Sequence, residues 1–317
     1  MKPTILLTGK TGQLGSELNR LLPRLGEVVA PERTELDLRE PKKICEIMRN
    51  VKPQLVINAA AYGAVDAAET DQASAYAVNA DAPRLLALEA KNFGAMLVHF
   101  SSDYVFDGAK KAPYVETDSP NPLNAYGRTK LAGEQAIRDS GVLHLIFRTS
   151  WVYATHGRNF LLTILRLATQ REELSIVCDQ IGAPTCAHDI AVATTKILTA
   201  IYRQDECRRS ISSLSGTYHM TAAGETSWYN FAKAILERTP TISRDVGWFA
   251  AATQGRPLIA KHIVPIPSEE FRSPTRRPNY SVLSNSRLTQ PFEVSLSDWA
   301  TQLQCCIGAR NAERASI

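Results

Sequence analysis

Several patterns that would place the chain in a special class are missing from its sequence. No apolar run approaches the roughly 18 residues that a membrane-spanning helix needs. Met1 leads directly into a short strand-like run, without the apolar stretch and small-residue cleavage site of an export signal. The six cysteines show no CxxC or zinc-type spacing, which in such a chain indicates reduced thiols. We therefore expect a cytoplasmic protein that does not contact a membrane.

Metal-ligand patterns and long charged runs are also missing. The six histidines are scattered without ligand spacing, so the sequence predicts no metal site. Lysine and arginine number 36 against 32 acidic residues, and the resulting net charge of +4 comes from interspersed residues. This pattern argues against nucleic acid as a partner and favours a small anionic ligand.

What remains is the composition of an ordinary globular protein. Hydrophobic residues make up 44% of the chain and charged residues 21%, so neither disorder nor a fibre is indicated. The 317 residues exceed the roughly 150 of an average domain. We expect either two lobes or one large α/β unit.

The first feature with chemical meaning is a glycine-rich turn near the N-terminus. Residues 3–8 form an apolar run of strand length, and a leucine pattern of helical spacing begins at Leu14. Between them, glycines at three-residue intervals allow a tight turn, close approach of the backbone to a pyrophosphate, and close packing of helix on strand. The predicted phosphate-binding residues are Gly9, Lys10, Thr11, Gly12, Gln13, Leu14 and Gly15.

The second predicted strand, residues 27–30, is followed by charges of both signs. In a dinucleotide-binding fold, an acidic residue here hydrogen-bonds a ribose 2′-hydroxyl, whereas a basic one accommodates a 2′-phosphate. Glu32 and Arg33 are both present, so the sequence leaves NADPH and NADH open, and it also leaves open that these are ordinary loop charges. Asp37 and Leu38 follow and are added to the candidate cofactor residues.

Two further buried strands are predicted to end at the same edge of the sheet. Residues 55–61 end in Ala59, Ala60 and Ala61, which would let a ligand lie against the backbone. Residues 96–100 are followed by Ser101 and Ser102, where ligands of parallel sheets bind. A helical pattern between these strands contains Asn79, another candidate cofactor residue.

Tyr126 and Lys130 form a potential acid-base pair on the next predicted helix. Their spacing of four residues places both side chains on one helical face. A tyrosine normally titrates near pH ~10, and a neighbouring cation favours the phenolate, so we expect Lys130 to lower the pKa of Tyr126. Such a tyrosine serves as a general acid or base.

Strands and helices alternate up to about residue 150, and this regularity is lost afterwards. The alternation predicts a Rossmann-type, doubly wound parallel sheet. We therefore divide the chain into a dinucleotide-binding domain, residues 1–150, and a smaller, loop-rich substrate lobe, mainly residues 151–317, from which segments could return to the sheet. Helices are predicted at residues 159–170, 188–202 and 227–237.

The glycine turn, the hydroxyl after strand four and the YxxxK helix together resemble the extended short-chain dehydrogenase/reductases that act on nucleotide sugars. Six longer blocks resemble the dTDP-4-dehydrorhamnose reductases within this group. They are residues 58–66 (NAAAYGAVD) with Glu69, 101–106 (SSDYVF), 126–134 (YGRTKLAGE), 147–153 (FRTSWVY), 179–185 (DQIGAPT) and 277–283 (RPNYSVL).

The resemblance implies a reductase that uses NADPH, with NADH also accepted, to reduce a 4-keto sugar nucleotide. It implies Tyr126 as proton donor, Lys130 as the residue that binds the nicotinamide ribose, and Ser102 as the hydroxyl that bonds the substrate carbonyl. The family usually has threonine at the position of Ser102, and serine retains both donor and acceptor. The implied substrate residues are Val65, Asp66, Ser102, Asp103, Tyr104, Tyr126, Trp151, Gln180, Pro184 and Thr185.

Other functions remain open at this point. The regulatory subunit of methionine adenosyltransferase resembles these reductases, so a non-catalytic regulatory protein is one alternative, although Ser102, Tyr126 and Lys130 favour catalysis. Another reductase or epimerase of nucleotide sugars is a second alternative. Trp151 could be a core aromatic and Arg277 part of a solvated basic patch. Formation of a homodimer is also left open.

Overall fold

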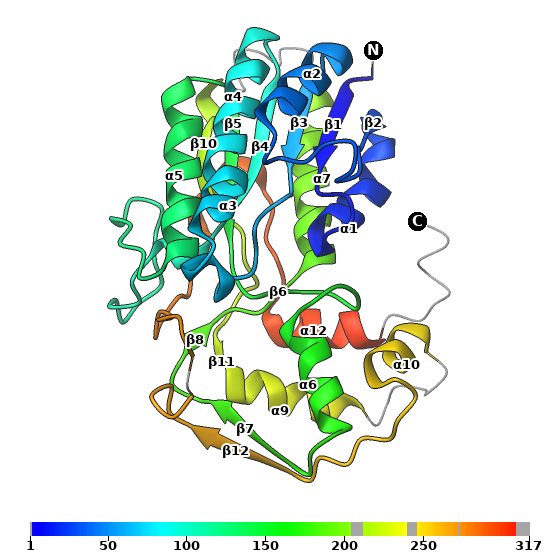
Figure 1. Ribbon diagram of the computed structural model, residues 1–317, viewed down its shortest axis with the longest axis vertical. Coiled ribbons are helices and arrows are strands. Elements are labelled where there is room, and N and C mark those ends of the chain that lie inside the picture. The colour runs from blue at the N-terminus through cyan, green and yellow to red at the C-terminus, as the bar shows by residue number, and fades with distance from the viewer. Residues whose placement is uncertain (1, 204–211, 240–245, 272, 309–317) are drawn as a thin grey trace.

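A six-stranded parallel sheet forms the centre of the larger, upper lobe of the computed structural model, which describes residues 2–203, 212–239, 246–271 and 273–308 (Figure 1). The strand order is β10-β5-β4-β3-β1-β2. The strands are β1 (Thr4–Thr8), β2 (Glu27–Val29), β3 (Leu55–Asn58), β4 (Met96–Ser102), β5 (His144–Thr149) and β10 (Gly216–His219). The chain order reverses between β1 and β3, which is where ligands bind in such sheets.

Helices cover both faces of this sheet, as the alternating side chains of its strands require. Ile5 and Leu7 of β1 belong to one apolar core, and Leu6 between them belongs to the other. The first face is covered by α1 (Gln13–Leu21), α7 (Ala187–Arg203) and α11 (Ser286–Phe292). The second is covered by α2 (Pro41–Val51), α4 (Ala82–Asn92) and α5 (Ala125–Ser140). The prediction of a doubly wound Rossmann-type sheet is therefore confirmed.

The boundaries of two predicted strands differ from those observed. β3 ends at Asn58 instead of Ala61, because the Asn58 side chain accepts a hydrogen bond from the Ala60 amide at 3.3 Å and the chain leaves the sheet. β4 continues to Ser102 instead of Phe100, because its last two residues pair with the end of β5. The three alanines therefore lie in a loop and the two serines on a strand.

Two segments from the second half of the chain belong to the larger lobe, one as a strand of the sheet and one as a helix packed on it. β10 pairs in parallel with β5 at the edge of the sheet, and α7 packs against α1. Residues 151–317 therefore contribute structure to the sheet as well as to the smaller lobe.

The smaller lobe has its own apolar core below the sheet in Figure 1. Its helices are α6 (Phe160–Ala168), α9 (Trp228–Arg238), α10 (Gly247–Thr253) and α12 (Trp299–Gly308). Its strands are β6 (Val152–Tyr153), β7 (Glu173–Val177), β8 (Ile181–Gly182), β9 (Thr185–Cys186), β11 (Thr226–Ser227) and β12 (His262–Ile266). Several of these strands have only two residues, so side-chain contacts hold much of the lobe together.

Short turns and helices connect the sheet strands near their carboxyl ends. They are η2 (Ala67–Glu69), α3 (Gln72–Tyr76), the π-helical η3 (Ala77–Asp81) and η4 (Asp103–Val105), whereas η1 (Leu22–Arg24) lies between α1 and the start of β2. None of the helices within the described ranges combines the length and the apolar character that crossing a membrane requires. Five of the six cysteines are free thiols, and Cys207 lies outside the described residues.

Candidate active site

A cleft of about 580 Å³ lies along the carboxyl ends of the parallel strands. Residues that follow β1, β3, β4 and β5 line it, so the cleft crosses the point where the strand order reverses. Most of the predicted cofactor and catalytic residues are among the lining: Gly9, Lys10, Thr11, Gly12, Gln13, Leu14, Glu32, Arg33, Asp37, Leu38, Ala59, Ala60, Ala61, Ser102, Tyr126 and Lys130. Two predicted substrate residues, Asp103 and Trp151, line it as well.

The glycine turn is tightly packed against the start of α1 at the cleft. Gly9 has a φ of +78°, and the amide of Gly12 donates to its carbonyl at 2.9 Å. A Cβ at Gly15 would lie 1.9 Å from that same carbonyl oxygen, so α1 packs directly on the turn. No side chain caps α1, which leaves its first N–H groups available to an anion.

Four charged side chains lie at the end of the cleft next to β2. Lys10 pairs with Glu32 at 3.4 Å, and Arg33 pairs with Asp37 at 3.8 Å. Both distances are long, and Glu32 and Arg33 are exposed, so these pairs contribute little stability. The pKa of Asp37 is lowered to about 2, mainly by its hydrogen bond with Arg39. The cationic side chains of Lys10 and Arg33 are therefore only weakly paired with carboxylates beside the cleft.

Asn79 lies behind the cleft wall instead of on it. Its side chain accepts a hydrogen bond from the Tyr62 amide at 2.8 Å and donates to the Tyr62 carbonyl at 3.2 Å. It also donates to Thr129 of α5 at 3.0 Å. Asn79 therefore fixes the loop after β3 against the helix that carries Tyr126.

The chain brings Ser102, Tyr126 and Lys130 to one part of the cleft. Ser102 ends β4, and the other two lie in the first turns of α5. Asn124 caps this helix by accepting a hydrogen bond from the Gly127 amide at 2.8 Å. Gly127 itself packs on the carbonyl of Tyr104, where a Cβ would come within 2.1 Å. The cap and the glycine place the helix start directly beside the end of β4.

The expectation that Lys130 lowers the pKa of Tyr126 is wrong for the free protein. Burial raises the pKa of Tyr126 to about 12, the Ser102 hydroxyl lowers it, and Asp103 raises it. The Lys130 ammonium donates instead to the carbonyl of Phe100 at 2.6 Å, and burial lowers the pKa of Lys130 to about 8. Tyr126 is consequently a neutral phenol that carries a proton at physiological pH.

Buried polar side chains from three strands lie behind Lys130. Thr8 donates to the Asn58 side-chain oxygen at 2.6 Å, and the Asn58 amide lies 3.1 Å from Nδ1 of His99. Nε2 of His99 lies 3.4 Å from the Lys130 amine. Burial lowers the pKa of His99 well below its usual value, and Lys130 lowers it further, so the imidazole is neutral.

The residues after β4 hold the Ser102 hydroxyl in place. It donates to the Asp103 carboxylate at 3.0 Å and accepts from the Tyr104 amide at 3.1 Å. Burial raises the pKa of Asp103 to about 7. The Tyr104 ring meets the Tyr126 ring edge to face, with centroids 5.9 Å apart. Tyr104 therefore supports Tyr126 from outside the lining of the cleft.

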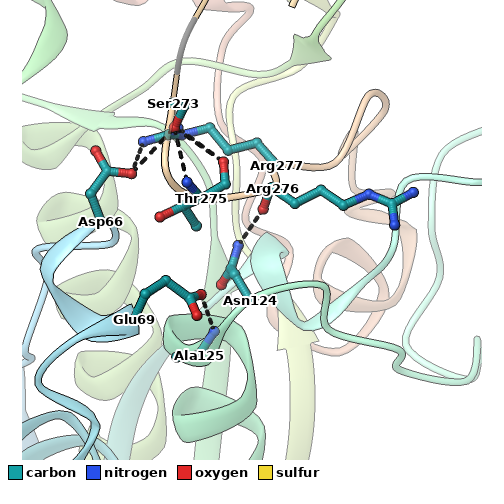
Figure 2. A network of polar contacts seen from close by, with 8 residues as sticks. All are labelled: Asp66, Glu69, Asn124, Ala125, Ser273, Thr275, Arg276 and Arg277. Atoms are coloured by element: carbon teal, nitrogen blue, oxygen red, sulfur yellow. Dashed lines mark hydrogen bonds and ion pairs between the residues drawn. The ribbon is translucent and has the colours of Figure 1, made fainter. Parts of the chain in front are cut away.

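Asp66 belongs to a polar network that joins the smaller lobe to the start of α5 (Figure 2). Arg277 donates to the Asp66 carboxylate at 2.7 Å. The Asn124 amide donates to the Arg276 carbonyl at 2.9 Å, and Glu69 accepts from the Ala125 amide at 2.7 Å. The loop of residues 273–277 and the turn at η2 thus contact the helix that carries Tyr126.

The remaining predicted substrate residues are not brought to the cleft lining. Val65 is half-buried in the turn before η2, whereas Gln180, Pro184 and Thr185 are buried in the smaller lobe. The Thr185 hydroxyl donates to the Ala183 carbonyl and accepts from the Ala222 amide, so it has a structural role there.

Several residues of the lining were not among the predicted site residues. They are Thr8, Pro31, Leu36, Tyr62, Gly63, Val78, Phe100, Thr149, Ser150, Val152 and Arg158. Most of them stand next to a predicted residue in the sequence, and this adjacency indicates that they lie near the site. Arg158 has no such neighbour: its carbonyl lies 3.4 Å from the Gln13 amide, which joins a distant loop to the glycine turn. In the described ranges, no three His, Cys, Asp or Glu side chains are grouped to hold a metal ion.

Comparison with known proteins agrees with this geometry. Residues 1–311 match the family model described as the RmlD substrate binding domain. The dTDP-4-dehydrorhamnose reductase of Burkholderia thailandensis is 48% identical over 303 residues, covering 96% of this chain and 97% of the relative. The chain belongs to the dTDP-4-dehydrorhamnose reductase family. The family member from Escherichia coli K12 is 40% identical and covers 93% of this chain and 94% of its own length.

Solved structures of the family share the whole fold. The dTDP-4-dehydrorhamnose reductase of Bacillus anthracis, solved in complex with NADP, gives a TM-score of 0.85 at 32% identity and covers 98% of this chain and 100% of its own. The family structure from Clostridium acetobutylicum gives 0.82 at 35% identity, with coverage of 96% and 99%. Both lobes of this chain therefore have counterparts in the family.

Proposed function

We propose that the protein reduces the C4 keto group of dTDP-4-dehydro-L-rhamnose to give dTDP-L-rhamnose, with NADPH as the preferred reductant and NADH also accepted. The observation that carries this proposal is one cleft that contains both the glycine turn and the side chains of Ser102, Tyr126 and Lys130. Relatives named for this activity match nearly the whole chain, which supports the choice of substrate.

The residues present fit a nicotinamide dinucleotide. The uncapped start of α1 and the glycine turn suit a pyrophosphate, and Lys10 and Arg33 lie where a 2′-phosphate would need cations. The small side chains of Ala59, Ala60 and Ala61 also line the cleft, so a ligand can lie close to the backbone there. When bound, the reduced nicotinamide would supply the hydride.

The side chains of this protein would handle the proton and the developing charge. As the C4 carbonyl oxygen gains negative charge, the Ser102 hydroxyl turns from Asp103 to donate its hydrogen bond to that oxygen, and Tyr126 transfers its proton. The raised pKa of Tyr126 keeps that proton in place until the oxygen becomes basic. Lys130 would bind the ribose next to the nicotinamide, and its ammonium would stabilise the phenolate left after the transfer.

Cellular location, partners and domain roles belong to the same proposal. We infer a cytoplasmic enzyme that acts on a small sugar nucleotide, does not bind nucleic acid, and has the capacity to form a homodimer. Residues 1–150 would hold the cofactor, and residues 151–317 would mainly hold the substrate. The substrate would be contacted by Val65 and Asp66 from the first part of the chain and by Gln180, Pro184 and Thr185 from the second. Analytical ultracentrifugation of the purified protein measures the oligomeric state.

The decisive experiment supplies dTDP-4-dehydro-L-rhamnose, generated in situ by the enzymes that precede this step. We expect NADPH to be oxidised and dTDP-L-rhamnose to accumulate in equal amounts. Cofactor binding without NADPH consumption, in the proven presence of substrate, would favour the regulatory-subunit alternative. Consumption of NADPH with formation of another sugar would change only the substrate.

A further inference from the structure

Trp151 has an unusual backbone conformation for a large residue. It follows β5, lines the cleft, and has a φ of +46°, in the left-handed region that side chains with a Cβ rarely adopt. Such a conformation costs free energy and persists only where the surrounding structure holds it. The contacts around its indole ring therefore show what holds Trp151 in this conformation.

Two residues of the smaller lobe are in close contact with that indole. The Trp228 ring stacks on it with centroids 3.4 Å apart and an interplanar angle of 5°. Gly182 lies against the indole so closely that a Cβ would come within 2.5 to 2.8 Å of three of its ring atoms. Any larger residue at position 182 would therefore displace the ring.

Gly182 and Trp228 belong to one small structural unit. Gly182 pairs with Thr226 in the two-stranded sheet of β8 and β11, and Trp228 follows β11 directly. The Ser227 side chain caps α9 by accepting a hydrogen bond from the Asn230 amide at 3.1 Å. This pairing and this cap fix both contact surfaces relative to each other.

From this arrangement we propose that Gly182 and Trp228 are positioning residues that hold the Trp151 indole as the wall of the sugar subsite. The inference rests on the proposed function, because it assigns to that wall the sugar ring of a sugar nucleotide. Neither residue lines the cleft, so each acts through Trp151. A mobile indole would lose its contact with the sugar ring while the cofactor end of the cleft stays intact.

The experiment measures binding of dTDP-L-rhamnose and of dTDP by calorimetry, together with KM for each substrate. In Trp228→Leu we expect affinity for dTDP-L-rhamnose to fall about tenfold, as for lost contacts in a specificity pocket, with little change for dTDP or in KM for NADPH. Gly182→Ala should give the same selective loss, because its added Cβ would displace the ring. Trp228→Phe retains a flat ring and should recover most of the affinity.

Near-ultraviolet circular dichroism provides a signal independent of activity. Two stacked indoles couple strongly, and this signal should disappear in Trp228→Leu and change in Gly182→Ala. Trp248→Phe is the matched control, because it removes a tryptophan of α10 without touching the stack and should change neither the signal nor the affinity.

The outcomes separate this inference from the proposed function. Unchanged affinity for dTDP-L-rhamnose in Trp228→Leu and Gly182→Ala, or an equal loss for dTDP and NADPH, overturns the positioning role. A wild-type protein that binds dTDP-L-rhamnose but does not consume NADPH refutes the reductase function, while the selective loss in the variants still supports the role of the stack.

Discussion

The two ends of the cleft are constructed in different ways. At the cofactor end, each contribution comes from residues that follow a strand of one regular sheet: Gly9 after β1, Glu32 after β2 and Ala59 after β3. At the other end, Trp151 is held by two-residue strands and by side chains far away in the sequence. The first end depends on backbone geometry, whereas the second depends on packing between side chains.

This difference implies that the two ends can be disturbed separately. Changes in the glycine turn should raise KM for NADPH, and changes around Trp151 should weaken binding of the sugar. Tyr126 and Lys130 lie between the two ends and should affect the chemical step. The predictions below test this separation, beginning with the largest expected effect.

Tyr126→Phe should lower kcat by about 10²- to 10⁴-fold, because it removes the proton donor while leaving the ring in place. The dissociation constant for NADPH should hardly change. Steady-state kinetics and fluorescence titration with NADPH measure the two quantities. Near-native turnover would remove Tyr126 from the mechanism.

Lys130→Met should impair both cofactor binding and proton transfer, since Lys130 is assigned to the nicotinamide ribose and to stabilising the charge of Tyr126. We expect kcat/KM to fall by roughly 10²-fold, with a higher KM for NADPH. A loss confined to kcat would show that Lys130 does not contact the cofactor.

The same variant should be more stable than the wild type at pH 7. Lys130 is 1% exposed, and burial lowers its pKa from 10.5 to about 8, so folding of the wild type includes the cost of burying a charge. Replacement by methionine should stabilise the fold by about 1 to 3 kcal/mol. Urea denaturation at pH 7 measures the difference, and a less stable variant would contradict the assignment.

The pH dependence of that difference follows from linkage. Between pH 8 and 10.5 the unfolded wild type binds more protons at Lys130 than the folded state, so its stability gains from rising pH. The advantage of Lys130→Met should therefore be complete below pH 8 and shrink toward pH 10.5. A difference that does not change over this range would mean that Lys130 has an ordinary pKa.

Gly15→Ala tests the cofactor end alone. The new Cβ would lie 1.9 Å from the Gly9 carbonyl, so α1 must move away from the turn. Overpacking of this kind costs about 1 to 3 kcal/mol, and we expect roughly a 5- to 150-fold weaker binding of NADPH, with binding of dTDP-L-rhamnose nearly unchanged. Gly247→Ala is the control, because a Cβ there meets no atom within 4 Å.

Arg33→Ala should have the smallest effect. Its side chain is 75% exposed, so removal should lower kcat/KM for NADPH by about tenfold or less and leave NADH unaffected. Arg49→Ala on α2 is the control, since its side chain is 67% exposed, pairs with Glu89 and does not line the cleft. A strong preference of the wild type for NADH would show that Glu32 dominates.

The sequence predicted the cofactor end and the catalytic residues far better than the substrate end, and the reason is physical. Gly9, Ser102 and Tyr126 follow strands or lie on a helix whose periodicity is visible in the sequence, so the parallel sheet alone brings them together. The stack of Trp151 on Trp228 and the contact of Arg277 with Asp66 depend on the folded lobe, and no local pattern places them. The raised pKa of Tyr126 was missed for a similar reason, because burial depends on the whole fold.

The position of β10 also affects how the chain acquires its structure during synthesis. The cofactor sheet cannot be completed until residues 216–219 have left the ribosome and paired with β5, and α7 must form before the apolar face next to α1 is covered. Until then, β5 has an unpaired edge that could join with another chain. The sheet therefore depends on contacts between residues far apart in the sequence, and such contacts make folding slow. Expression of the first 150 residues alone should give an aggregation-prone fragment, even though they contain every proposed catalytic side chain.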